Sequence, residues 1–134
     1  MDSVTLGVIV GNRGFFPDHL VTEARKEVSS LFKKKNVKLI IVSPEDTKLG
    51  GIESWEEAQK CARLFKEHKD EIDGVLAPLP NFGDEKAVAN TLRLSELDVP
   101  VLVHAYADRA DQMMADRRRD SFCGKISVCN NLSQ

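Results

Sequence analysis

The chain has few cysteines, and those it has do not form the pattern of a disulfide framework or a metal site. Cys61, Cys123 and Cys129 are an odd number, and no two of them form a Cys-x-x-Cys pair. A structural zinc site needs several closely grouped ligands, and a disulfide framework needs an even set of cysteines. The spacing therefore predicts reduced thiols, which are typical of cytoplasmic proteins.

Long hydrophobic runs and an excess of one charge are also missing. No apolar stretch approaches the roughly 20 residues that span a bilayer, and Met1-Asp2-Ser3 does not begin a signal peptide. The 19 Lys and Arg residues against 21 Asp and Glu give a net charge of -2. Nucleic-acid binding needs a dominant basic face instead. We therefore expect a cytoplasmic protein whose partners include neither a membrane nor a nucleic acid.

The motifs of common α/β enzymes are absent as well. No glycine-rich turn leads into Lys-Ser or Lys-Thr, as a P-loop requires, and only Gly11 and Gly14 stand where a dinucleotide site has three glycines. No Gly-x-Ser-x-Gly turn is present to carry a nucleophile. The acidic residues fall mostly at expected helix caps and helix exteriors, so no carboxylate and histidine set indicates a metal site. By itself the chain is a poor candidate for a self-sufficient enzyme.

What the chain does contain is a regular alternation of apolar runs and amphipathic stretches. Residues 75–77 form a continuous apolar run, which is typical of a strand covered on both faces, and similar, largely apolar runs occupy residues 4–10, 37–42 and 99–103. Helices are expected to start near Asp18, at Ser54 and at Asp84, and Ser54 with Glu57 forms a capping-box pattern. The inner faces of these helices are Leu20, Ala24, Val28 and Leu31; Ala58, Cys61, Ala62 and Phe65; Ala87, Val88, Thr91 and Leu92. The pattern predicts a flavodoxin-like or Rossmann-like three-layer α/β sandwich with a parallel sheet in the order 2-1-3-4.

The C-terminal stretch is harder to assign. Ala110, Met113 and Met114 indicate a weak helix, and residues 125–129 are compatible with a fifth strand that no closing helix follows. We interpret residues 1–134 as a single α/β domain and residues 117–134 as the start of a connection to a second domain.

Polar and aromatic residues gather where the predicted strands end. In a parallel sheet these carboxyl ends lie along one edge and feed the ligand-binding loops. Amide and guanidinium groups offer directed hydrogen bonds, and flat aromatic rings cover the apolar side of a sugar. We therefore expect a site for a hydroxyl-rich ligand such as a monosaccharide, formed by Asn12, Arg13, Phe16, Asn81, Phe82, His104 and Tyr106.

Each of these residues also has a purely structural interpretation. Arg13 is equally compatible with an ion pair to Asp18 or to another carboxylate. A histidine after four apolar residues, such as His104, is more often a core histidine than an acid or base. Phe82 and Tyr106 are also compatible with plugs that close the end of the sheet.

Three segments together resemble the N-terminal part of the L-fucose isomerase-like sugar isomerases, which are related to the L-arabinose isomerases. The resemblance spans essentially the whole chain, and its most specific segment is the last. These segments are Gly11-Asn-Arg-Gly-Phe-Phe-Pro-Asp18, Ala77-Pro-Leu-Pro-Asn-Phe-Gly83 and Arg118-Arg-Asp-Ser-Phe-Cys-Gly-Lys-Ile-Ser-Val-Cys-Asn-Asn131.

The resemblance implies the N-terminal domain of a manganese-dependent aldose–ketose isomerase that works through an enediol. It implies that the Mn²⁺ ligands lie in later domains, so that this chain carries no catalytic residue, metal ligand or cofactor of its own. It also implies that the domain leans over the pocket of a neighbouring subunit in a homo-oligomer, a trimer or hexamer. On this basis Arg13, Asn81 and Phe82 are expected near the neighbour's sugar. Fucose isomerases tend to carry a tryptophan in the third loop, where this chain has Pro80-Asn-Phe82.

Two other functions stay open at this point. The pattern Asp73-Gly-Val-Leu-Ala-Pro78 followed by Val99-Pro-Val-Leu-Val103 is shared with the sugar-binding lobes of periplasmic-type sugar sensors. A pure oligomerisation domain, whose loops contact no sugar, is the other alternative.

Overall fold

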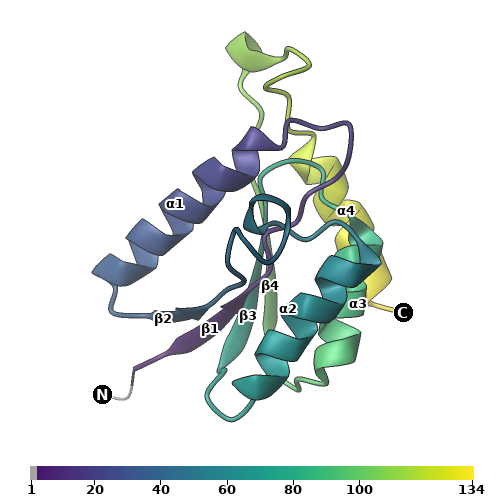
Figure 1. The fold of residues 1–134 in the computed structure, drawn as a ribbon. Helices are drawn as coiled ribbons and strands as arrows, with labels where there is room; N and C mark the ends of the chain where they lie inside the picture. The colour runs from purple at the N-terminus through teal and green to yellow at the C-terminus, as the bar shows by residue number, and fades with distance from the viewer. Residues whose placement is uncertain (1–2) are drawn as a thin grey trace.

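A parallel sheet flanked by helices forms the centre of the molecule, whose computed structural model describes residues 3–134 (Figure 1). The sheet has four strands in the order β2-β1-β3-β4, and every pair is parallel. The predicted flavodoxin-like α/β sandwich is therefore confirmed. The strands are β1 Thr5–Val8, β2 Lys38–Ile40, β3 Gly74–Leu79 and β4 Val101–Ala105; the helices are α1 His19–Lys34, α2 Trp55–Glu67, α3 Glu85–Ser95 and α4 Ser121–Leu132.

The two faces of the sheet are covered unequally. Helix α1 lies on one face, and α2, α3 and α4 lie side by side on the other (Figure 1). Successive residues of β1 point to opposite faces, as the pleat of a strand requires. Val8, the last residue of β1, therefore packs in the smaller core beneath α1, and Ile9, which follows directly, packs in the larger core around Phe65.

The start and the inner face of α2 are as predicted from the sequence. The side chain of Ser54 accepts from the backbone N–H of Glu57, and the Glu57 carboxylate accepts from that of Ser54, which completes the capping box. The residues expected to face inward are all buried: Ala58, Cys61, Ala62 and Phe65. In α1 one residue differs, because Leu31 is half-exposed while Val21 is fully buried.

The expected fifth strand is wrong, because residues 125–129 belong to helix α4. The buried residues of this helix are Ser121, Gly124 and Val128, which recur at helical spacing. Two of them are small, so the sequence shows no apolar stripe, and the alternation at Ile126 and Val128 imitates a strand. The helix that closes the domain is therefore present. The weak helix expected near Met113 is only a 3₁₀ turn, Ala110–Gln112, and both Met113 and Met114 are exposed.

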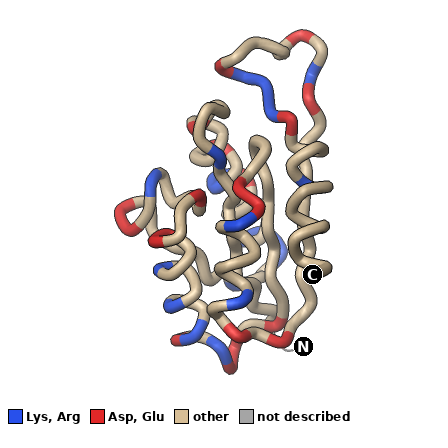
Figure 2. Tube along the Cα trace, turned by 90° about the vertical axis from the view of Figure 1, so that its right-hand side faces the viewer, with Lys and Arg blue, Asp and Glu red and all other residues tan. Residues whose placement is uncertain are grey.

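The side of the molecule formed by β4 and α4 carries little charge. Lys125 is the single charged residue within α4, as the mostly uncoloured helix in Figure 2 shows. The loop between β4 and α4, in contrast, carries charges of both signs and projects beyond the sheet (Figures 1 and 2). Within residues 3–134, none of the helices combines the length and the apolar character that a membrane crossing requires.

Candidate functional site

The predicted site residues all lie at the carboxyl ends of β1, β3 and β4, in or beside the loops that follow these strands. We call them the strand-end rim: Asn12, Arg13, Phe16, Asn81, Phe82, His104 and Tyr106. Because all strands of the sheet are parallel, their carboxyl ends lie at the same edge, and these residues lie along that edge as expected.

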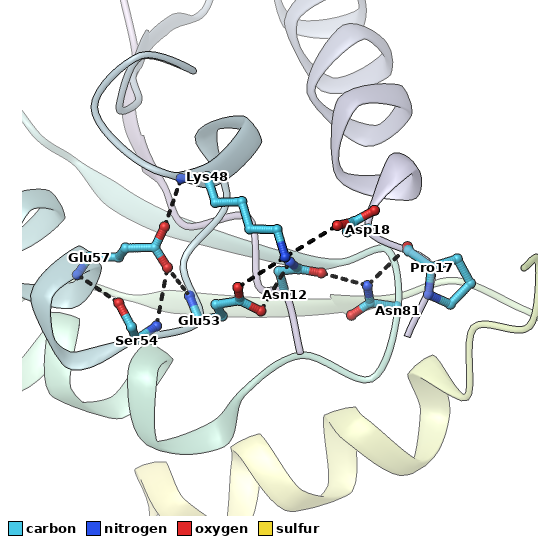
Figure 3. Close-up of polar contacts among 8 residues, drawn as sticks. All are labelled: Asn12, Pro17, Asp18, Lys48, Glu53, Ser54, Glu57 and Asn81. Atoms are coloured by element: carbon cyan, nitrogen blue, oxygen red, sulfur yellow. Dashed lines mark hydrogen bonds and ion pairs between the residues drawn. The ribbon is translucent and has the colours of Figure 1, made fainter. Parts of the chain in front are cut away.

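Asn12 and Asn81 form the buried base of the rim (Figure 3). The Nδ2 of Asn81 donates to Oδ1 of Asn12 at 2.7 Å and to the carbonyl oxygen of Pro17 at 3.2 Å. The Oδ1 of Asn81 accepts from the backbone N–H of Gly83 at 3.1 Å. Because these amide groups are occupied within the protein, the asparagines hold the first and third loops together.

The polar contacts of Asn12 extend into the long loop after β2. The Nδ2 of Asn12 donates to the Glu53 carboxylate at 3.2 Å (Figure 3). The Nζ of Lys48 lies 3.4 Å from the Glu53 carboxylate and 3.2 Å from that of Asp18. The hydrogen bond with Asp18, together with the charge of Glu53, raises the pKa of the Lys48 ammonium group. The Glu57 carboxylate accepts from the backbone N–H groups of Lys48 and Glu53, in addition to that of the N-cap residue Ser54. The sequence signalled only the cap at Glu57 and not this wider set of contacts.

Arg13 and the aromatic rings of Phe16 and Phe82 lie close together at the rim. The guanidinium carbon of Arg13 lies 5.0 Å from the centre of the Phe82 ring, and the Phe16 and Phe82 ring centres are 5.5 Å apart. Nη1 of Arg13 pairs with the Glu85 carboxylate at 2.6 Å, so Glu85 and not Asp18 is its acidic partner. The Arg13 side chain is still 39% exposed. It therefore keeps N–H groups that face solvent from a fixed position.

The other half of the rim consists of His104 and Tyr106. Their rings meet edge to face with centres 4.7 Å apart. His104 is exposed, so the interpretation as a core histidine is wrong. Tyr106 is partly buried, and this burial raises the pKa of its hydroxyl group.

Two arginines that the sequence did not single out complete the rim. Arg118 lies over the ring of Phe16 at 5.9 Å, and Arg119 over the ring of Tyr106 at 5.0 Å. Nη1 of Arg119 also donates to the carbonyl oxygen of Pro80 at 3.0 Å. Both belong to the C-terminal segment that carries the most specific resemblance, and that resemblance was the one feature of the sequence that could have indicated them.

The same segment fastens the loops after β3 and β4. The Ser121 hydroxyl accepts from the backbone N–H of Tyr106 and donates to the carbonyl oxygen of Leu79. At Gly124 a Cβ atom would lie 1.8 Å from the carbonyl oxygen of Phe82, so only glycine fits. Helix α4 therefore rests directly on the backbone of the third loop.

A comparison with known protein families shows to which family the chain belongs. The sequence model of the fucose/sulfoquinovose isomerase N-terminal domain matches residues 7–134. The chain belongs to this family. None of the curated proteins compared with the chain matches it. The family match confirms the resemblance drawn from the three segments, and its range runs from β1 through α4, so it includes the whole strand-end rim.

The side chains of this fucose/sulfoquinovose isomerase N-terminal domain do not fit the manganese ion that the resemblance implies. Within residues 3–134, no group of three or more His, Cys, Asp and Glu side chains is arranged to hold a metal. The rim carboxylates are engaged elsewhere, Glu53 with Asn12 and Lys48, and Glu85 with Arg13.

Proposed function

We propose that the chain is the N-terminal domain of a metal-dependent aldose–ketose isomerase of the L-fucose/L-arabinose type. In this proposal the domain closes the substrate pocket and takes part in subunit assembly, in a cytoplasmic trimer or hexamer. The remaining domains of the same enzyme supply the Mn²⁺ site and transfer the proton through the enediol. The family membership supports the reaction class, and the contacts of the rim support the role of this domain.

The observation that carries the proposal is the position of Arg13 over the Phe82 ring, with the Phe16 ring beside Phe82. An aromatic face binds the apolar C–H face of a sugar ring, and guanidinium N–H groups donate to hydroxyl oxygens. The Glu85 ion pair and the Phe82 ring fix the Arg13 side chain while part of it stays exposed. A fixed donor beside aromatic rings suits a surface that covers a monosaccharide, because little side-chain entropy is lost on binding.

The buried asparagines contribute by holding this surface in place. The hydrogen bond between Asn12 and Asn81 joins the loop of Arg13 to the loop of Phe82. The role we assign to Asn12 and Asn81 is therefore to position Arg13 and Phe82 against the sugar. This division of labour assigns binding and water exclusion to this chain, and proton transfer to the rest of the enzyme.

Replacement of Arg13 in the complete isomerase tests the pocket role. Arg13→Ala removes a contact made in both the bound and the transition state, so we expect KM to rise about tenfold with a smaller change in kcat. Arg93→Ala is the matched control, because Arg93 belongs to α3 and lies outside the rim, 6.0 Å from the ring centre of Trp55 on α2. Unchanged KM and kcat for Arg13→Ala would contradict the pocket role and favour a pure oligomerisation domain.

Calorimetry on the 134-residue chain separates this proposal from a sugar-binding lobe. A domain that covers a pocket completed by other domains is expected to bind L-fucose or L-arabinose too weakly for detection. Binding in the micromolar range by the chain alone would instead favour the sensor-type lobe.

The side of the molecule formed by β4 and α4, which carries little charge, supports the assembly role. Leu102 on the outermost strand is 63% exposed, and Phe122 and Ile126 on α4 are 58% and 72% exposed. Beside them, a hollow of about 590 Å³ opens between β4 and the end of α4; its lining is mostly apolar, with Leu92, Val101, Val103 and Leu132, and also includes Lys125. Exposed apolar patches of this kind mark contact surfaces. We assign this side to contacts with the rest of the enzyme.

A charge placed on this side tests the assignment. Ile126→Lys is expected to shift the complete enzyme toward smaller species in sedimentation velocity, because burial of an unpaired ammonium group is unfavourable. Thr22→Lys, on the exposed face of α1, is the control and is expected to leave the sedimentation unchanged. Equal sedimentation of both variants and the unaltered enzyme would contradict the assembly role of α4.

A further inference from the structure

Arg119 differs from the other arginines of the rim in having no acidic partner. Arg13 pairs with Glu85, and Arg118 pairs with Asp120 at 2.9 Å. The side-chain contacts of Arg119 within residues 3–134 are the Pro80 carbonyl oxygen and the face of Tyr106, with no carboxylate oxygen within 4.0 Å. A partly buried guanidinium group is thus held at the rim without a counter-charge.

The geometry around Arg119 leaves its hydrogen-bonding capacity mostly unused. A guanidinium group carries five N–H donors in a planar fork. The Pro80 carbonyl engages Nη1, while the Tyr106 ring supports the plane of the group. The Asp108 carboxylate accepts from the backbone N–H groups of Arg119 and Asp120 at 2.8 and 3.0 Å, and within residues 3–134 it forms no ion pair with the guanidinium group of Arg119. The free donors match the oxygen atoms of an oxyanion, which guanidinium binds in a bidentate manner.

We propose that Arg119 is a specificity-determining residue that binds an anionic substituent, a sulfonate or a phosphate, on the sugar substrate. This inference rests on the proposed function, since it takes the rim to face the substrate. The family description includes both fucose, a neutral sugar, and sulfoquinovose, a sugar with a sulfonate group. A guanidinium without a counter-charge favours the charged sugar, because hydrogen bonds between charged groups are roughly twice as strong as neutral ones.

Arg118 adds to this preference from the adjacent position. Its Nε pairs with Asp120, and the side chain is 50% exposed beside the ring of Phe16. Its terminal N–H groups make no other ion pair within the described residues 3–134. Two neighbouring guanidinium groups therefore lie at the rim, one neutralised and one not, and Arg119 is the one that decides the charge of the ligand.

The test compares substrates on the complete isomerase. kcat/KM is measured for L-fucose, for sulfoquinovose and for glucose 6-phosphate, with the unaltered enzyme and with Arg119→Gln and Arg119→Lys. Arg119→Gln keeps a donor for the Pro80 carbonyl but removes the charge. We expect it to lower the ratio of kcat/KM for the anionic sugar to that for L-fucose at least tenfold. Arg119→Lys is expected to restore part of this ratio, and Arg93→Gln on α3 serves as the control that leaves it unchanged.

The outcomes separate the inference from the proposed function. A loss confined to sulfoquinovose identifies a sulfonate, and a loss confined to glucose 6-phosphate identifies a phosphate. Equal losses for neutral and anionic sugars would show that Arg119 only positions Pro80, and the inference would fail. An enzyme that isomerises L-fucose but neither anionic sugar would overturn the inference and leave the proposed function standing. An enzyme that isomerises none of these sugars and does not isomerise L-arabinose either would refute the proposed function, and the inference with it.

Discussion

At the scale of single residues, Asn81 determines how the rim is held. Its side chain is fully buried and bonds to Asn12, Pro17 and the backbone of Gly83. Asn81→Ala removes these bonds and leaves Oδ1 of Asn12 and the N–H of Gly83 buried without a partner. We expect the free energy of unfolding to fall by about 2–4 kcal/mol, as measured by urea denaturation.

A double-mutant cycle isolates the contact between the two asparagines. Residues in direct contact usually show a coupling energy of about 0.5–3 kcal/mol, so Asn12→Ala and Asn81→Ala should not be additive. Asn130→Ala, at an exposed position of α4, is the control and should change stability by less than about 0.5 kcal/mol. Additive effects of the two rim variants would refute the link between the first and third loops.

The residue types of the rim could be predicted from the sequence, but their orientation could not. An asparagine after a strand has the same sequence signature whether its amide faces a ligand or a neighbouring loop. The partner of Arg13 was equally hidden, because Glu85 lies 72 positions away and comes close only through the pairing of β1 with β3. Whether the rim contacts a sugar stays a prediction.

At the scale of elements, α4 is the helix that the sequence does not predict. The first three helices, and their inner faces apart from Leu31 in α1, were predictable because each has an apolar stripe at helical spacing. In α4 the inner positions are Ser121, Gly124 and Val128, chosen for close contact and hydrogen bonding and not for apolar burial. Small inward residues leave no periodic apolar signal, so the sequence of α4 is also compatible with a strand.

Gly124→Ala tests the contact between α4 and the third loop. Alanine favours a helix by up to about 1 kcal/mol relative to glycine, but its Cβ would lie 1.8 Å from the Phe82 carbonyl oxygen. Because that atom is backbone, the helix or the loop must move, and we expect a net destabilisation of about 1–3 kcal/mol. The matched control is Gly14→Ala, where nothing lies within 4 Å of the added atom. A stability gain at Gly124 in urea denaturation would contradict the close contact.

At the scale of the whole molecule, the order of the strands was predictable for a general reason. Parallel strands joined by helices need crossover connections, and these follow one handedness, which leaves few possible orders. What the sequence did not indicate is the uneven covering of the sheet, with α1 alone on one face. This depends on where the third and fourth helices pack, and amphipathic spacing does not specify that.

The larger core provides a probe of global unfolding through Cys61. This thiol is fully buried, whereas Cys123 and Cys129 are exposed. Burial raises the pKa of Cys61 to about 12, so the reactive thiolate is absent from the folded protein at pH 8. In a Cys123→Ser/Cys129→Ser background we expect Cys61 to react with a thiol reagent only as fast as the whole domain opens. Rapid labelling of Cys61 without denaturant would show that the core opens locally.

The raised pKa of Cys61 also determines the direction in which the free energy of unfolding changes with pH. The folded pKa of Cys61 lies above its ordinary value of 9.0, so the contribution of the neutral thiol is complete below that pH. As the pH rises from about 9 toward 12, only the unfolded chain loses the proton, and unfolding becomes easier by up to about 1.4 kcal/mol per pH unit. Cys61→Ala is expected to lower stability at neutral pH because it leaves a cavity, and also to remove this part of the alkaline decline. Parallel stability curves for the two proteins between pH 8 and 10.5 would show that Cys61 does not report on the core.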